Sequence, residues 1–207
     1  MKKALLLSFF AVAASTASAA ARLVETQVQI GSGDSAYTET YYSVEITGTG
    51  VDVGRPGAFY VGAVRNNAQI FYLGSDGWQQ YKGGMGAATE MFPNIPGTPR
   101  YYHPITGVAI GKPINNHWYW GNKYGNARLG ATKMEVCGLA GMAKVDLWAG
   151  IGSLSPDKEE MVQTWHREKN PLIDPNHIRN VYVQTDMQKN QKYWQIGTFD
   201  CTESGGA

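Results

Sequence analysis

The sequence predicts an all-β fold, an antiparallel β-sandwich-like domain with one short α-helix. Glycine makes up 25 of the 207 residues and aromatic residues make up 12%. This composition favours short strands and tight turns, because glycine destabilises helices and aromatic residues pack well in sheets. Several segments alternate apolar and polar residues with a period of two, as strands with one wet face do. Only one segment carries the residues that begin a helix.

The N-terminus, residues 1–19, is predicted to be a signal peptide. A cationic start is followed by an apolar run at residues 4–14 and then by small residues, with cleavage expected after Ala19 or Ala21. The apolar run is shorter than the roughly 20 residues that a membrane-spanning helix needs. We therefore expect an exported protein, periplasmic or extracellular, with no membrane span in its mature chain.

The mature chain is expected to form one β-rich domain over residues 22–201, followed by a flexible tail at residues 202–207. The alternative is a division into two halves near residue 130. Cys137 and Cys201 are the two cysteines of an exported chain, so we expect them to form a disulfide.

The first half of the chain is predicted to be a series of antiparallel strands. Residues 23–30 and 37–47 alternate apolar and polar side chains and are predicted to pair. Residues 58–64 are densely apolar and predict a buried strand. Turn residues then separate it from residues 69–73 and 78–81, which predicts a three-stranded meander.

The middle of the chain is less regular. Residues 83–99 are rich in Gly and Pro and predict a long loop, and residues 101–114 predict another strand with its flanks. Residues 133–141 and 144–151 have strand composition around the first cysteine. Within the second of these segments, residues 147–151 resemble residues 59–64, since both are apolar with a glycine inside.

The predicted helix spans residues 156–168. Ser155 can cap it, a proline suits its first turn, and acidic residues follow where the helix dipole is positive. The helix is expected to end before Pro171. Residues 181–185 and 193–199 are predicted to close the domain as strands.

Turn and core residues recur in a pattern across residues 52–84. The pattern is Asp52-Val53-Gly54-x-Pro56-Gly57-x-x-Tyr60-Val61-Gly62-Ala63, followed by Gly77-Trp78-x-x-Tyr81-x-Gly83-Gly84. It resembles a segment of β-rich modules in exported bacterial proteins of unassigned function. The resemblance covers about one sixth of the chain and implies a small β-sandwich module. It carries over no catalytic residue.

Charge and motifs exclude several classes of function. The signal peptide holds two of the 18 Lys and Arg residues, which leaves 16 (18 − 2) against 17 Asp and Glu. A near-neutral chain does not suit nucleic-acid binding, which needs many cations. The sequence has no nucleophile elbow, phosphate loop, calcium loop or zinc-ligand spacing. Asp174 and His177 can supply two ligands, but a polar loop explains them. We therefore predict a protein that is not an enzyme and holds neither metal nor cofactor.

The candidate ligand-binding residues form one aromatic cluster. In an extended segment, Trp118 and Trp120 share one face while His117 and Tyr119 share the other. Two neighbouring rings make a platform for the apolar face of a sugar, and Asn116 can bond its hydroxyls. The alternative is that one face belongs to the core and the other packs across strands.

Three functions are possible as hypotheses. The first is an exported non-enzymatic binding or structural module, which contacts a glycan or cell-surface polymer through exposed aromatic residues. The second is a subunit of a fimbria- or sheath-like assembly, because a strand close to the mature N-terminus can pair with a neighbour's sheet edge. The third is a secreted hydrolase without a recognisable motif, which needs a cleft where a histidine or two carboxylates converge.

Overall fold

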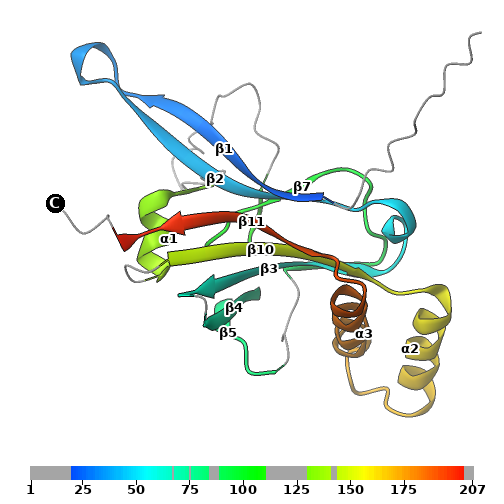
Figure 1. Cartoon of the computed structure of the whole chain (residues 1–207). Coiled ribbons are helices and arrows are strands. Elements are labelled where there is room, and N and C mark those ends of the chain that lie inside the picture. The colour runs from blue at the N-terminus through cyan, green and yellow to red at the C-terminus, as the bar shows by residue number, and fades with distance from the viewer. Residues whose placement is uncertain are drawn as a thin grey trace, which may run out of the picture.

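The described residues fold into two antiparallel sheets and three short helices (Figure 1). The computed structural model describes residues 20–66, 68–74, 76–83, 89–110, 130–140 and 144–202. The predicted β-rich, sandwich-like architecture is confirmed, as is the helix at residues 156–168. The predicted signal peptide, residues 1–19, lies outside the described residues.

The first sheet has five strands in the order β1-β2-β7-β8, with β9 also paired to β2. Its strands are β1 (Ala20–Ile30), β2 (Tyr37–Thr47), β7 (Arg100–Tyr102), β8 (Ala109–Ile110) and β9 (Ala131–Thr132). The predicted first pair is confirmed: β1 and β2 pair along their whole length, from Ala20 opposite Thr47 to Ile30 opposite Tyr37. The far end of this hairpin projects beyond the body of the molecule (Figure 1).

The second sheet has six strands in the order β11-β10-β3-β4-β5, with β6 also paired to β3. Its strands are β3 (Gly57–Arg65), β4 (Gln69–Gly74), β5 (Gly77–Gln80), β6 (Glu90–Phe92), β10 (Lys144–Ser153) and β11 (Tyr193–Asp200). The predicted meander is confirmed as β3, β4 and β5. The predicted loop at residues 83–99 contains β6, which is too short to show a periodicity.

The main core lies between the two sheets. Val44 and Ile46 of β2 meet Phe59 and Val61 of β3 and Ile151 of β10, and none of the five is exposed. These positions alternate along each strand, so the residues between them point to the opposite face. In the six-stranded sheet that opposite face is the outer face, which is turned away from the main core.

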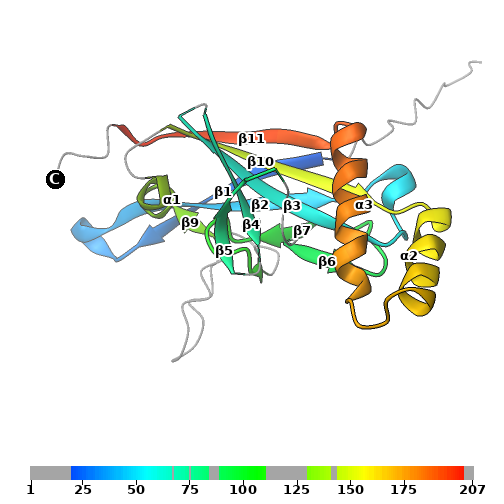
Figure 2. The same cartoon turned by 90° about the horizontal axis from the view of Figure 1, so that it is seen from below.

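Two helices cover part of this outer face. The helix α3 (Pro175–Lys189) crosses β3 and β10, and α2 (Pro156–Glu168) packs against α3 (Figures 1 and 2). Residues 181–185, predicted as a strand, belong to α3, so that prediction is wrong. The helix begins after Asp174, whose side chain accepts a hydrogen bond from the Asn176 N–H, and Val183 and Met187 are buried one turn apart.

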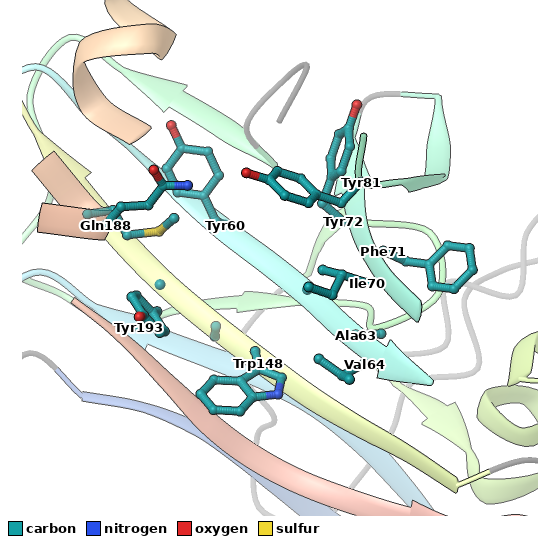
Figure 3. Close-up of a pocket in the computed structure, with 14 residues that line it drawn as sticks. Tyr60, Ala63, Val64, Ile70, Phe71, Tyr72, Tyr81, Trp148, Gln188 and Tyr193 are labelled. Carbon is teal, nitrogen blue, oxygen red and sulfur yellow. The ribbon is translucent and has the colours of Figure 1, made fainter. Parts of the chain in front are cut away.

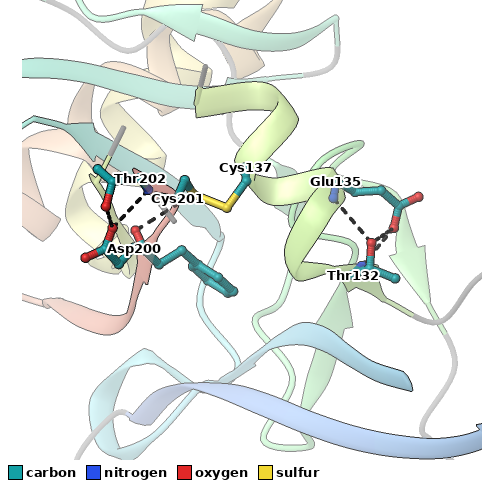
Figure 4. The surroundings of a disulfide bond; sticks show 7 residues. Thr132, Glu135, Cys137, Asp200, Cys201 and Thr202 are labelled. Carbon is teal, nitrogen blue, oxygen red and sulfur yellow. Dashed lines mark hydrogen bonds between the residues drawn. A yellow bond between two sulfur atoms is a disulfide. The ribbon is translucent and has the colours of Figure 1, made fainter. Parts of the chain in front are cut away.

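The third helix, α1 (Lys133–Ala140), replaces another predicted strand, over residues 133–141. Thr132 and Glu135 explain it as a capping box. The Glu135 N–H donates to Thr132 Oγ1 at 3.2 Å, and the Thr132 N–H donates to Glu135 Oε2 at 2.7 Å (Figure 4). This reciprocal capping satisfies two backbone amides at the start of α1. The strand-like composition of residues 133–141 alone does not reveal such a cap.

The predicted disulfide is confirmed. Cys137 of α1 bonds to Cys201, which follows β11, with their Cα atoms 5.2 Å apart (Figure 4). The bond ties α1 to the end of the edge strand of the six-stranded sheet. Among the described residues, no helix combines the length and apolarity that crossing a membrane requires.

Candidate functional site: an aromatic trough on the outer face

The residues that the sequence singles out for ligand binding are not part of the described structure. Asn116, His117, Trp118, Tyr119 and Trp120 all fall within residues 111–129, which lie outside the described residues. That site stays a prediction. The described part of the chain offers a different candidate, built from residues that the sequence did not single out for ligand binding.

A cavity of about 510 Å³ opens on the outer face of the six-stranded sheet, beside α3 (Figure 3). We call it the aromatic trough, and define it by Tyr60, Gly62, Tyr72, Tyr81, Trp148 and Tyr193. Its volume falls in the range typical of small-molecule and cofactor sites.

The trough exists because α3 covers only part of the outer face. Tyr60 of β3 lies under the helix and is 2% exposed, and its hydroxyl donates to Asn180 Oδ1 at 2.8 Å. The chain leaves the helix after Lys189. Further along β3 and β10, the outward residues Gly62 and Trp148 are only partly buried. The last turn of α3 therefore forms one border of the trough.

Gly62 makes the floor of the trough. It pairs with Trp148 on β10 and with Tyr72 on β4, so it lies between two aromatic residues in the register. A Cβ atom at Gly62 would lie 3.4 Å from the Phe71 carbonyl oxygen and 3.9 Å from the Trp148 Cβ, both ordinary contacts. The packing therefore does not require glycine here, although glycine inside a strand costs about 0.5–1 kcal/mol. What the missing side chain does is leave a hollow between the two rings.

One buried polar group beside the trough has no hydrogen-bond partner among the described residues. The Trp148 Nε1 atom is buried and makes no hydrogen bond within the described residues. A buried donor left unpaired costs about 1–3 kcal/mol. The Trp148 ring packs on Tyr193 with ring centroids 6.1 Å apart. By contrast, the Tyr72 hydroxyl donates to Gln79 Oε1 at 2.7 Å.

The trough is uncharged. Among the residues described as lining it, none carries a charge at neutral pH, and none is a histidine, serine, cysteine or carboxylate. Burial raises the pKa of Tyr60, and the negative charge of Asp186 adds to that effect. The Tyr60 phenol therefore stays neutral throughout the physiological range. The described lining can bind a ligand but supplies no nucleophile and no general base.

A polar cluster of the described residues joins the C-terminal part of α3 to the sheet. Lys192 Nζ donates to Asp52 Oδ1 at 2.6 Å and to Asp186 Oδ2 at 2.7 Å. Ser153 joins them: its hydroxyl donates to Asp52 at 2.6 Å and its N–H to Asp186 at 2.9 Å. Burial disfavours the Lys192 charge, but the hydrogen bonds to Asp186 and Asp52 outweigh it and raise its pKa. The cluster fastens the end of α3 to the sheet.

The described residues contain no group of three or more His, Cys, Asp and Glu side chains placed to hold a metal ion. Asp174, considered with His177 as a ligand pair, caps α3 instead. The predicted polar loop around these two residues is wrong beyond Asp174, since α3 begins at Pro175.

A signal for the trough was present in the sequence. The two similar segments, residues 59–64 and 147–151, are neighbours in the sheet, and each has an aromatic residue two positions before a glycine. Antiparallel pairing places Trp148 opposite Gly62 and Tyr60 opposite Gly150. Because both strands carry an aromatic residue two positions before a glycine, each aromatic ring on the outer face lies opposite a glycine of the neighbouring strand.

No family model matches this chain, and comparison with curated proteins and with solved structures finds no significant match. The resemblance of residues 52–84 to exported bacterial β-rich modules therefore stays an expectation.

Proposed function

We propose that this protein is an exported binding module that holds a neutral glycan in the aromatic trough. The observation that carries the proposal is the hollow above Gly62, set between Trp148 and Tyr72 in an uncharged aromatic site. Export is supported by the signal-like N-terminus and by the disulfide between Cys137 and Cys201.

The dimensions of the hollow suit one layer of ligand atoms. Neighbouring strands lie about 4.8 Å apart, so β10 and β4, on either side of β3, are roughly 9.6 Å apart. A ring held between two aromatic side chains needs about 7–8 Å, that is, two contacts of about 3.5–4.0 Å each. A sugar ring fills such a gap as a single layer, and its apolar face packs on aromatic rings.

The polar groups of the trough also suit a sugar. Tyr81, Tyr193 and Gln188 bring two hydroxyls and an amide to the lining. These groups bond hydroxyl oxygens without requiring a charge. Binding of a charged polymer is disfavoured, because its charges would lose their hydration and gain no opposite charge in the described lining. The absence of nucleophiles and bases from that lining favours binding over hydrolysis.

The experiment is a titration of the mature protein with neutral and charged glycans, followed by tryptophan fluorescence. The test variant is Gly62→Ala, which fills the hollow with a methyl group that the fold has room for. We expect its affinity for the bound glycan to fall at least about ten-fold, because the ligand ring and the methyl group compete for one space.

The matched control is Gly138→Ala. A Cβ atom at Gly138 meets nothing within 4 Å, and α1, which contains it, contributes no residue to the described lining. This variant should bind like the wild type. If Gly62→Ala stays folded and binds as well as Gly138→Ala, the trough is not the site. A double change of Trp118 and Trp120 to Ala then tests the site predicted from sequence.

One observation favours self-assembly as a second function. The strand β1 is an edge strand of 11 residues and pairs, among the described strands, with β2 alone. Its other edge can accept a strand of a second copy. Sedimentation of the mature protein at high concentration tests this function. Growing oligomers that Val28→Pro on β1 abolishes would support it, and a stable monomer would contradict it.

A further inference from the structure

The floor of the aromatic trough follows β3, while its lining reaches from Tyr193 of β11 to Tyr81, just after β5. Its floor consists of the outward residues Tyr60, Gly62 and Val64, which follow the two-residue period of the strand. Trp148 of β10 stands on one side of this line and Tyr72 of β4 on the other. Figure 3 shows Tyr60 near α3 and Val64 toward the opposite end.

The end of the trough under α3 is closed. Beside Tyr60, a Cβ atom at Gly150 would lie 2.5 Å from the Met187 Sδ atom, and one at Gly152 would lie 2.0 Å from the Val183 carbonyl oxygen. There is no room for even one methyl group between sheet and helix. Gln188, in the last turn of α3, lines this closed end (Figure 3).

Within the described residues, the other end of the trough is open. The exposed fraction of the lining side chains rises from 2% at Tyr60, through the half-buried Val64, to 48% at Ile70. Tyr72, only 6% exposed, lines one side, and on the other side Trp148 packs against Tyr193, which is 43% exposed. A chain can therefore enter past Val64 and Ile70 but cannot pass beneath α3.

From this shape we infer that the trough binds the end of a glycan chain and not its interior. The inference rests on the proposed function. The terminal sugar ring lies over Gly62 with its leading edge toward Gln188, whose amide can both donate and accept a hydrogen bond. The following units leave past Val64 and Ile70 into solvent. A polymer then offers one site per suitable end, however long it is.

The test compares two preparations of the neutral polysaccharide that binds best in the titration, intact and partly hydrolysed by acid. Both are used at the same total sugar content, and their chain ends are counted by reducing-sugar assay. We expect the amount of bound protein at saturation to rise in proportion to the number of ends. The inference would be overturned if the amount of protein bound at saturation depended on the total sugar content and not on the number of chain ends.

Variants separate this inference from the proposed function. Gln188→Ala should weaken binding of both preparations about five-fold, the effect of losing one neutral hydrogen bond. Equal saturation of both preparations, with binding still lost in Gly62→Ala, would keep the trough as the site and refute end recognition. Binding that Gly62→Ala leaves intact, or no binding to any polysaccharide, would refute the proposed function and the inference together.

Discussion

The outer face of the six-stranded sheet has two regions that use glycine for opposite reasons. In the covered region, under α3, Gly152 allows close approach, since a Cβ atom there would lie 2.0 Å from the Val183 carbonyl oxygen. In the trough region, a Cβ atom at Gly62 would meet its nearest neighbour at 3.4 Å. The first glycine is required by packing, while the second leaves open space. The comparison shows that the fold depends on one region and leaves the other available for a ligand.

Hydrogen bonding separates the same two regions. Under α3, Tyr60 bonds Asn180, and the buried cluster of Lys192 with two aspartates is satisfied. Beside the trough, the Trp148 indole N–H is left unpaired within the described residues. The described hydrogen bonds thus fasten the helix to the sheet, whereas the buried indole N–H beside the trough contributes no such bond.

The largest expected effect is that of Gly152→Ala. The added methyl group meets backbone atoms of α3, so the helix must shift, and we expect a loss of about 3 kcal/mol in the free energy of unfolding. Urea denaturation of the variant and the wild type measures it. A loss below about 1 kcal/mol would show that α3 is not seated against the sheet as closely as this geometry requires.

The next effect is that of Lys192→Met, which leaves Asp52 and Asp186 without their cation. We expect a loss of about 2 kcal/mol at neutral pH, because removing one partner strands the buried charges of the others. Thermal unfolding at about pH 7 measures it, with Lys189→Met on the exposed end of α3 as the control. If both variants unfold at the same temperature, the cluster does not hold α3 in place.

The same lysine predicts a dependence on pH. Its pKa is raised above 10.5 in the folded state, so its contribution to stability is present below that pH and is lost as the pH rises through the folded pKa. Burial raises the pKa of Tyr60 as well, and the folded state then holds that proton longer than the unfolded state does. Unfolding midpoints should therefore fall above about pH 10. Stability that rises from about pH 9 to about pH 11 would contradict both assignments.

A smaller effect is expected from Trp148→Phe in the trough. The variant keeps an aromatic wall but offers a smaller ring for a sugar to pack on, so glycan affinity should drop about five-fold while stability changes little. Isothermal titration with the bound glycan measures it, and the matched control is Trp165→Phe on α2, which does not belong to the described lining. Unchanged affinity in Trp148→Phe would mean that the larger indole ring does not contact the ligand.

The smallest effect is that of Gly62→Ala on stability. Alanine fits the floor and restricts the unfolded chain, so we expect a gain of about 0.5 kcal/mol, opposite in sign to Gly152→Ala. Urea denaturation of the two variants side by side decides it. A loss at Gly62 as large as that at Gly152 would abolish the distinction between the two regions.

Local patterns predicted much of the fold. The alternation in residues 23–30 and 37–47 predicted β1 and β2, and the cap and proline at residues 155–156 predicted α2. The helix α3 was missed because Val181 and Val183 favour strands locally, while burial at one-turn intervals against the sheet favours the helix.

The trough was harder to predict, because its members come from distant parts of the chain. Trp148 meets Gly62 across two strands whose register no local rule determines. The similarity of residues 59–64 and 147–151 indicated related strands but did not show that they are neighbours. The aromatic cluster at residues 117–120 is conspicuous because its rings are adjacent in sequence, whereas those of the trough are adjacent only in space.

The disulfide has a mechanical consequence when the protein is placed under tension. If the chain is pulled by its two ends, the Cys137–Cys201 bond bears the tension and shields the 64 residue steps between the two cysteines. At about 3.6 Å per extended residue, roughly 230 Å of chain stays slack. That shielded stretch contains α2, α3, β10 and β11, while the strands before α1 bear the load. Reduction of the disulfide would add this stretch to the length that the chain can reach. Redox conditions therefore determine how far the molecule can extend under tension.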